Sequence, residues 1–184
     1  MTLSPYDPAR PDGINPSATE TLGAEGRLTP GQVHEIPARQ GRALRLGHGV
    51  RIAEDIDIDY LEDVAVVDLG RTAEWVRDRG IALEVCPTSN LQTGAVAAFG
   101  GGPERHPVDM LYRTGFTVTI SPDNRLMSGT SVTGELAALV AHFGYGLEDL
   151  ERLQRNAAAA AFLPLEDRTA LDGMITDGFE GMHA

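Results

Sequence analysis

Thr117-Val-Thr-Ile-Ser-Pro-Asp-Asn-Arg-Leu-Met-Ser128 is the stretch of this chain that decides its fold. A run rich in β-branched residues, 116–120, stops at Ser121-Pro122, and Asp123 and Asn124 follow directly. Polar groups just beyond the carboxyl end of a buried strand are where α/β folds keep their chemistry. The stretch therefore predicts a strand over 116–120 with a functional site at its carboxyl end.

Two earlier segments have the same form, Arg45-Leu-Gly-His-Gly49 and Leu83-Glu-Val-Cys-Pro-Thr-Ser-Asn90. They predict strands over 43–46 and 81–86. Amphipathic spacing between and after the strands predicts helices over 69–79, 107–113, 133–143 (with Thr133 as the cap) and 148–162. Alternating strands and helices favour parallel pairing with right-handed crossovers. The acidic residues at 55–59 and 62–63 suggest a solvated loop or a short helix.

The parallel arrangement makes a prediction about the site. Parallel strands present all their carboxyl ends at one edge of the sheet. We therefore expect His48, Cys86 or its neighbours, and Asp123 at the same end, with His48 facing the Asp123 carboxylate across a cleft.

The length of 184 residues is too short for a complete (β/α)₈ barrel, which takes roughly 250 residues. Residues 1–42 hold six of the 11 prolines and show neither helical nor strand periodicity. Such sequence is typical of an irregular or disordered arm. The folded part is expected over 43–184.

Charge and cysteine content exclude several classes of protein. The 27 acidic and 15 basic residues give a formal charge of −12, which disfavours binding to nucleic-acid backbones. A single cysteine, Cys86, allows no internal disulfide and fits a reducing compartment. No apolar run approaches the roughly 20 residues of a membrane span, and no secretory signal pattern is present. The expected compartment is the cytoplasm.

The three segments 45–55, 84–94 and 123–128, in this order, resemble the carboxyl-terminal half of the adenosine deaminase family, and the match runs from about 43 to 171. The resemblance implies an α/β fold that is partly TIM-barrel-like, comprising the last three β/α units of the barrel behind the irregular arm. It also implies a hydrolase of purine metabolism, which converts adenosine and water to inosine and ammonia with a metal-activated water.

The resemblance assigns roles to individual residues. Asp123 aligns with the metal-binding aspartate of the family, although an aspartate here could also simply cap a turn. His48 aligns with the histidine that orients the metal-bound water. Asn124 stands where many members have a second acid that binds a purine nitrogen, and its amide can donate a hydrogen bond at any pH. Pro122 replaces the usual threonine and removes a backbone N–H beside Asp123.

Other parts of the family's zinc site are missing. The chain has five histidines but no His-x-His pair. The nearest match to the motif with the catalytic glutamate is Val33-His34-Glu35, which is too close to His48 for a strand-helix-strand unit between them. The remaining histidines are interpreted as structural, exposed or at the tail: His106, His142 and His183. Because zinc catalysis normally takes three protein ligands, the set is incomplete, and we expect the chain alone to be inactive.

Three interpretations of the chain remain open. It is the carboxyl-terminal portion of a deaminase, truncated or completed by an amino-terminal barrel half; or a degenerate module that binds a purine or a protein surface; or a small independent α/β domain. The expected partners are an adenosine-like purine nucleoside and either the complementary barrel half or a second copy. Three strands leave at least one sheet edge open to such pairing.

Overall fold

The computed structural model describes residues 42–61 and 64–183, and its centre is a three-stranded parallel sheet. The strands are β1 (Arg45–Gly47), β4 (Ala82–Val85) and β5 (Val118–Ile120), in the order β1-β4-β5. Leu83 of β4 is paired with Leu46 on one side and Val118 on the other. The predicted parallel sheet is confirmed. The predicted arm lies almost entirely outside the described residues.

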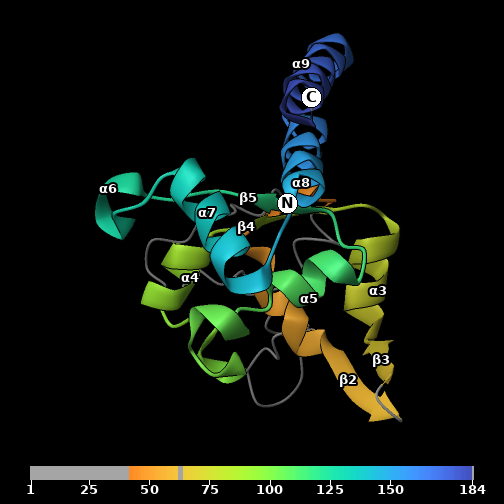
Figure 1. The fold of residues 1–184 in the computed structure, drawn as a ribbon. Helices are drawn as coiled ribbons and strands as arrows, with labels where there is room; N and C mark the ends of the chain where they lie inside the picture. Colours follow the sequence, from red (N-terminus) through yellow and green to blue (C-terminus); the bar gives the residue numbers. More distant parts are fainter. Residues whose placement is uncertain (1–41, 62–63, 184) are drawn as a thin grey trace, which may run out of the picture.

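The four predicted helices are present with shifted ends. They are α3 (Arg71–Asp78), α5 (Val108–Arg113), α7 (Val132–Phe143) and α8 (Leu147–Ala159) (Figure 1). The predicted cap of α7 at Thr133 is wrong. Ser131 caps this helix, and its Oγ accepts a hydrogen bond of 3.1 Å from the Gly134 N–H.

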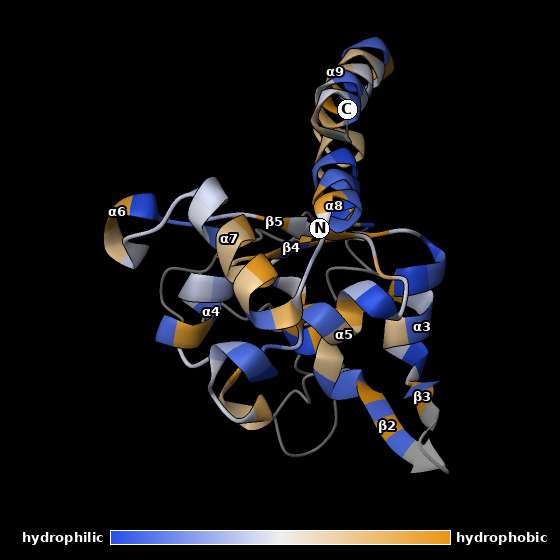
Figure 2. Ribbon diagram, viewed as in Figure 1, coloured by the Kyte–Doolittle hydropathy of each residue, from blue (hydrophilic) through white to orange (hydrophobic). Residues whose placement is uncertain are grey.

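The acidic segment expected to be a loop or short helix forms an antiparallel hairpin instead, made of β2 (Ile56–Leu61) and β3 (Val64–Leu69). Apolar and acidic residues alternate along β2, as its striped colouring shows (Figure 2). This period of two places the isoleucines on one face and the aspartates on the other. The hairpin projects from the body of the molecule (Figure 1).

Several further elements join these parts. They are the 3₁₀ turns η2 (Gly49–Asp55), η3 (Ala97–Phe99) and η4 (Pro103–Arg105) and the helices α4 (Pro87–Gln92), α6 (Arg125–Ser128) and α9 (Leu165–His183).

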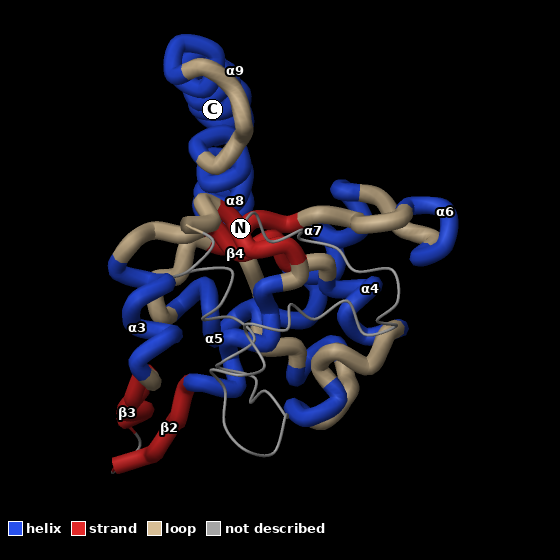
Figure 3. Tube along the Cα trace, turned by 180° about the vertical axis from the view of Figure 1, so that it is seen from behind, coloured by secondary structure: helices blue, strands red, loops and turns tan. Residues whose placement is uncertain are grey.

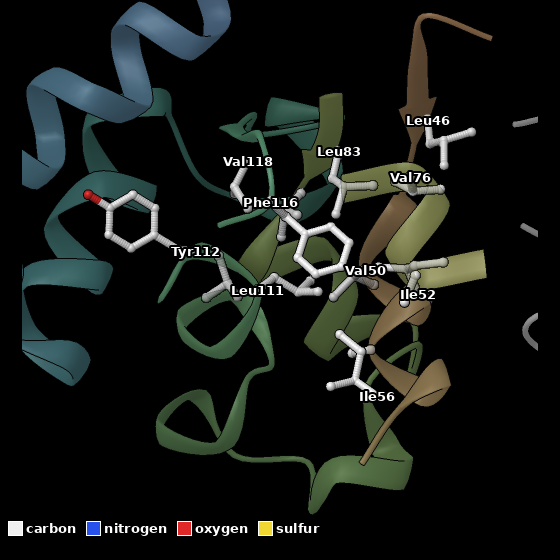
Figure 4. Packing of buried hydrophobic residues seen from close by; sticks show 14 of the residues in the cluster. Leu46, Val50, Ile52, Ile56, Val76, Leu83, Leu111, Tyr112, Phe116 and Val118 are labelled. Carbon is white, nitrogen blue, oxygen red and sulfur yellow. The ribbon is translucent and has the colours of Figure 1, made fainter. Parts of the chain in front are cut away.

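The apolar core connects the sheet to η2, α3 and α5. Leu83, Val118 and Leu111 are each 0 % exposed. The ring of Phe116 lies between Leu83 and Val50 (Figure 4). Burying one such side chain contributes roughly 1.5–3 kcal/mol, so this cluster is what holds the three strand ends in place.

Helices α8 and α9 pack against each other and project from the rest of the molecule in both views (Figures 1 and 3). Asn156 of α8 donates a hydrogen bond of 2.9 Å to the Val118 carbonyl of β5. Arg155 donates two, of 2.8 and 3.1 Å, to the two carboxylate oxygens of Asp172 in α9. The outer helix leaves Met174 71 % exposed, so much of its apolar surface is uncovered.

Candidate functional site

His48 and Asp123 come together at the carboxyl ends of the parallel strands. His48 follows β1, and Asp123 lies three residues after the end of β5. His48 Nε2 is 4.0 Å from Asp123 Oδ2. Both side chains are partly exposed, at 55 % and 38 %, so a small molecule can reach them. The structure therefore brings together His48 and Asp123, the two residues that the sequence analysis singled out. Their chemical roles stay predictions.

The backbone at His48 makes a tight left-handed turn. Its φ of 53° and ψ of 34° lie in the left-handed region, and the residue stands at the N-terminal capping position of η2, just before Gly49. The next residue, Gly49, is buried against the sheet, and a Cβ there would lie 2.8 Å from Leu83 Cδ2. A larger residue would force the strand end away from the core, so glycine is required for this approach.

Asp123 is held by a residue that the sequence analysis did not single out. Ser89, which is 5 % exposed, donates a hydrogen bond of 2.7 Å from Oγ to Asp123 Oδ2. A short bond of this type to a carboxylate is among the stronger hydrogen bonds in proteins. The one available signal was the position of Ser89 just after the second strand end. Asp123 also has a positive φ, of 54°.

Asn124 has one polar end engaged and the other available. Its Oδ1 caps α6 by accepting a hydrogen bond of 3.1 Å from the Met127 N–H. The cap of α6 therefore comes from Asn124. Asp123, for which the sequence also allows a turn-capping role, does not cap this helix. Since the oxygen faces the helix, the exposed NH₂ group is the end that can donate to a ligand.

A second unpredicted contact lies behind the site. Glu135, in the first turn of α7, is 0 % exposed, and its Oε2 accepts a hydrogen bond of 3.1 Å from the Thr88 N–H. Thr88 immediately precedes Ser89, which holds Asp123. Sequence reasoning could not find Glu135, because its partner is a backbone group 47 residues away.

Cys86 lies at the same strand end, but its thiol is unreactive. Burial raises the pKa of its thiol to about 11, and the negative charge of Asp123 acts in the same direction. The thiol is therefore protonated near neutral pH, and a protonated thiol is neither a good nucleophile nor a good metal ligand.

The described residues do not make a complete zinc site. Within 42–61 and 64–183, no group of three or more histidine, cysteine or acidic side chains is arranged to hold a metal. His106 is 3 % exposed, and its Nδ1 accepts a hydrogen bond of 3.1 Å from the Val108 N–H, so it is structural as predicted. His142 is exposed. The weak motif at His34 and Glu35 lies outside the described residues.

No helix in the described part of the chain is both long and apolar enough to cross a membrane.

Comparisons with known proteins agree on one family. The sequence model of the family described as adenosine deaminase matches residues 14–177. The adenosine deaminase of Mycobacterium avium is 50 % identical over 140 residues, which cover 76 % of this chain and 37 % of that protein. This chain therefore spans little more than a third of the length of this relative.

Solved structures show the same fold at lower identity. The adenine deaminase of Arthrobacter aurescens superposes with a TM-score of 0.67 at 20 % identity, over 85 % of this chain and 42 % of that one. An amidohydrolase of Burkholderia ambifaria with bound Zn gives a TM-score of 0.67 at 17 % identity, over 85 % and 38 %. The described sheet and helices correspond to part of the barrel of such enzymes. The chain belongs to the adenosine deaminase family.

Proposed function

We propose that this chain contributes the carboxyl-terminal portion of an adenosine deaminase active site and works only when an amino-terminal barrel portion completes it. The reaction adds water to the purine carbon that bears the exocyclic amine and releases ammonia, converting adenosine to inosine. The observation that carries the proposal is the 4.0 Å approach of His48 Nε2 to Asp123 Oδ2 at the strand ends, in a chain of this family.

Each residue has a distinct part in this proposal. His48 orients the attacking water and stabilises the charge that develops as the water adds. Asn124 donates a hydrogen bond from its NH₂ group to a purine ring nitrogen. The carboxylate of Asp123, fixed by Ser89, is the one metal ligand that this part of the chain offers.

In this proposal zinc binds only when residues from outside this chain complete the ligand set. The described residues alone do not fit a zinc ion, because catalytic zinc normally takes three protein ligands. We therefore expect the isolated chain to contain no stoichiometric zinc and to bind it only when further ligands are supplied.

The unpaired surfaces of the sheet favour an amino-terminal barrel portion as the partner. In the described sheet, β1 and β5 each pair on one side only. Next to β1, Leu44 is 73 % exposed, and Phe162 beyond α8 is 72 % exposed. On the outer edge of β5, Asn156 already donates to the Val118 carbonyl, so the open edge is that of β1. An open strand edge beside exposed apolar side chains favours association with another chain. We place the assembly in the cytoplasm, because Cys86 is a free thiol and a reducing compartment keeps thiols free.

The test is complementation. The chain is purified alone and together with the amino-terminal portion of the Mycobacterium avium enzyme, and inosine formation and zinc content are measured. We expect no turnover and no stoichiometric zinc from the chain alone, and zinc-dependent turnover from the mixture that D123A abolishes. The proposal fails if the mixture binds adenosine without turnover, which is the behaviour of a binding module, or if D123A is as active as the unchanged chain.

A further inference from the structure

We propose that Glu135 is a positioning residue: its buried carboxyl group fixes the Thr88 backbone and thereby the turn from which Ser89 holds Asp123. The inference depends on the proposed function only for its effect on turnover. The contacts themselves are properties of this chain, and they can be tested without any activity.

The contacts form a short continuous path. Glu135 Oε2 accepts the Thr88 N–H at 3.1 Å, Thr88 is covalently joined to Ser89, and Ser89 Oγ donates to Asp123 Oδ2 at 2.7 Å. The path runs from α7 through the start of α4 to the end of β5. A shift of α4 by a few tenths of an ångström would therefore be passed directly to the Asp123 carboxylate.

The start of α4 explains why a distant carboxyl group is needed. The first N–H groups of a helix have no partner within it. Residue Cys86 stands at the capping position and makes no side-chain cap, and Pro87 has no N–H to satisfy. The Thr88 N–H is the next donor, and Glu135 accepts it. Glu135 therefore acts as the missing cap of α4, supplied from another helix.

Packing alone does not explain why an acid occupies position 135, because burying a carboxyl group is unfavourable. The side chain is 0 % exposed, and among the described residues its Oε1 has no hydrogen-bond partner. A buried polar atom without a partner destabilises the folded state, and an apolar residue of similar size would avoid that cost. The first turn of α7, where the helix dipole favours an acid, offsets part of it. The remaining cost is explained by a positional role for the carboxyl group.

Two isotope-labelled NMR signals test the path in the full chain without requiring catalysis: the hydrogen-exchange rate of the Thr88 amide and the ¹³C shift of the Asp123 carboxyl carbon. In E135L, Thr88 exchange should accelerate at least roughly tenfold, which is what losing about 1.4 kcal/mol of protection gives, and the Asp123 signal should move. In E135Q, which keeps an acceptor oxygen, both changes should be smaller. In S89A, the Asp123 signal should move while Thr88 exchange stays unchanged.

A matched control separates positioning from general stability. Leu136 is next to Glu135 on α7 and packs against the core. L136A should lower the Tm and leave the Asp123 signal in place. The inference is wrong if E135L and E135Q leave the Asp123 signal where it is in the unchanged chain, or if L136A moves it as far as they do.

Turnover in the complemented enzyme gives the final readout. There, E135L should lower kcat about tenfold and leave KM for adenosine unchanged, because Asp123 is misplaced while purine contacts remain; E135Q, which keeps the acceptor, should lower kcat less. Equal losses in E135L and L136A would contradict a positioning role. Failure of the unchanged chain to form inosine under complementation would count against the proposed function alone, since the NMR signals still decide the role of Glu135.

Discussion

Asp55 caps the start of α3 from outside the helix. Replacing it by alanine should destabilise the fold more than the same replacement of any surface aspartate in β2 or β3. Its Oδ2 accepts two hydrogen bonds, of 3.0 Å from the Thr72 N–H and 2.8 Å from the Ala73 N–H. The residue at the capping position, Gly70, has no side chain to do this. The Asp55 carbonyl also accepts the Gly70 N–H at 2.7 Å.

The size of the effect follows from these contacts. Loss of a helix N-terminal cap costs about 0.5–2 kcal/mol, and hydrogen bonds to a charged acceptor contribute about 1.5–3 kcal/mol. Thr72 and Ala73 are 6 % and 0 % exposed, so water cannot easily replace the lost acceptor. We therefore expect D55A to lower the free energy of unfolding by about 2–3 kcal/mol, or the Tm by roughly 4–12 °C.

Asp57 provides a matched control two residues away. It lies directly opposite Asp68 across the hairpin, and like charges in this position repel each other. D57A should therefore leave stability unchanged or raise it by up to about 0.5 kcal/mol. D55N, which keeps an oxygen acceptor without the charge, should fall between D55A and the unchanged chain.

Urea unfolding followed by circular dichroism measures the three variants, with the slope of the free energy against urea concentration checked for constancy. Hydrogen exchange of the Thr72 and Ala73 amides should accelerate in D55A alone. The reasoning is refuted if D55A lies within about 0.5 kcal/mol of D57A, since the remote cap would then contribute nothing.

Three further outcomes are expected. Since burial raises the pKa of Cys86 from 9.0 to about 11, thiol reagents at pH 8 should label it only on unfolding, and stability should fall as pH rises from 9 to 11. Burial lowers the pKa of His106 from 6.5 to about 4, so between these pH values the unfolded chain binds a proton at this residue and the folded chain does not. The free energy of unfolding should therefore fall by on the order of 3 kcal/mol as pH falls through that interval, and H106N should show a smaller fall. L83A, at a fully buried position of the central strand, should cost about 2–5 kcal/mol in urea unfolding, against less than about 1 kcal/mol for I58A on the exposed hairpin.

The sheet and the meeting of His48 with Asp123 could be predicted because short-range patterns specify them. Each strand is an apolar or β-branched run closed by glycine or proline, and parallel pairing then places the carboxyl ends together. The hairpin does not follow from composition, because a cluster of acidic residues favours a solvated loop or a short helix. The alternation of Ile56 and Ile58 with aspartates carried the correct signal, a period of two with one apolar face.

The contacts that hold the site could not be predicted for a different reason. Ser89 and Glu135 act on partners that are 34 and 47 residues away in the sequence. Neither contact leaves a periodic trace, since one ends on a side chain and the other on a backbone N–H. The long helix α9 was also missed, because Gly173, Gly178 and Gly181 interrupt its sequence and weaken its intrinsic helix propensity.

The left-handed backbone at His48 and Asp123 has a consequence for how this sequence changes over generations. A residue with a Cβ in that region costs on the order of 1 kcal/mol relative to glycine, although histidine and aspartate tolerate it better than most. At 123 the hydrogen bond from the buried Ser89 offsets this strain, whereas His48 has no comparable hydrogen bond among the described contacts. Selection for stability alone would therefore favour glycine at 48 and keep an acceptor at 123. Among related sequences, glycine at 48 beside an unchanged aspartate at 123 would mark copies in which only stability has been maintained.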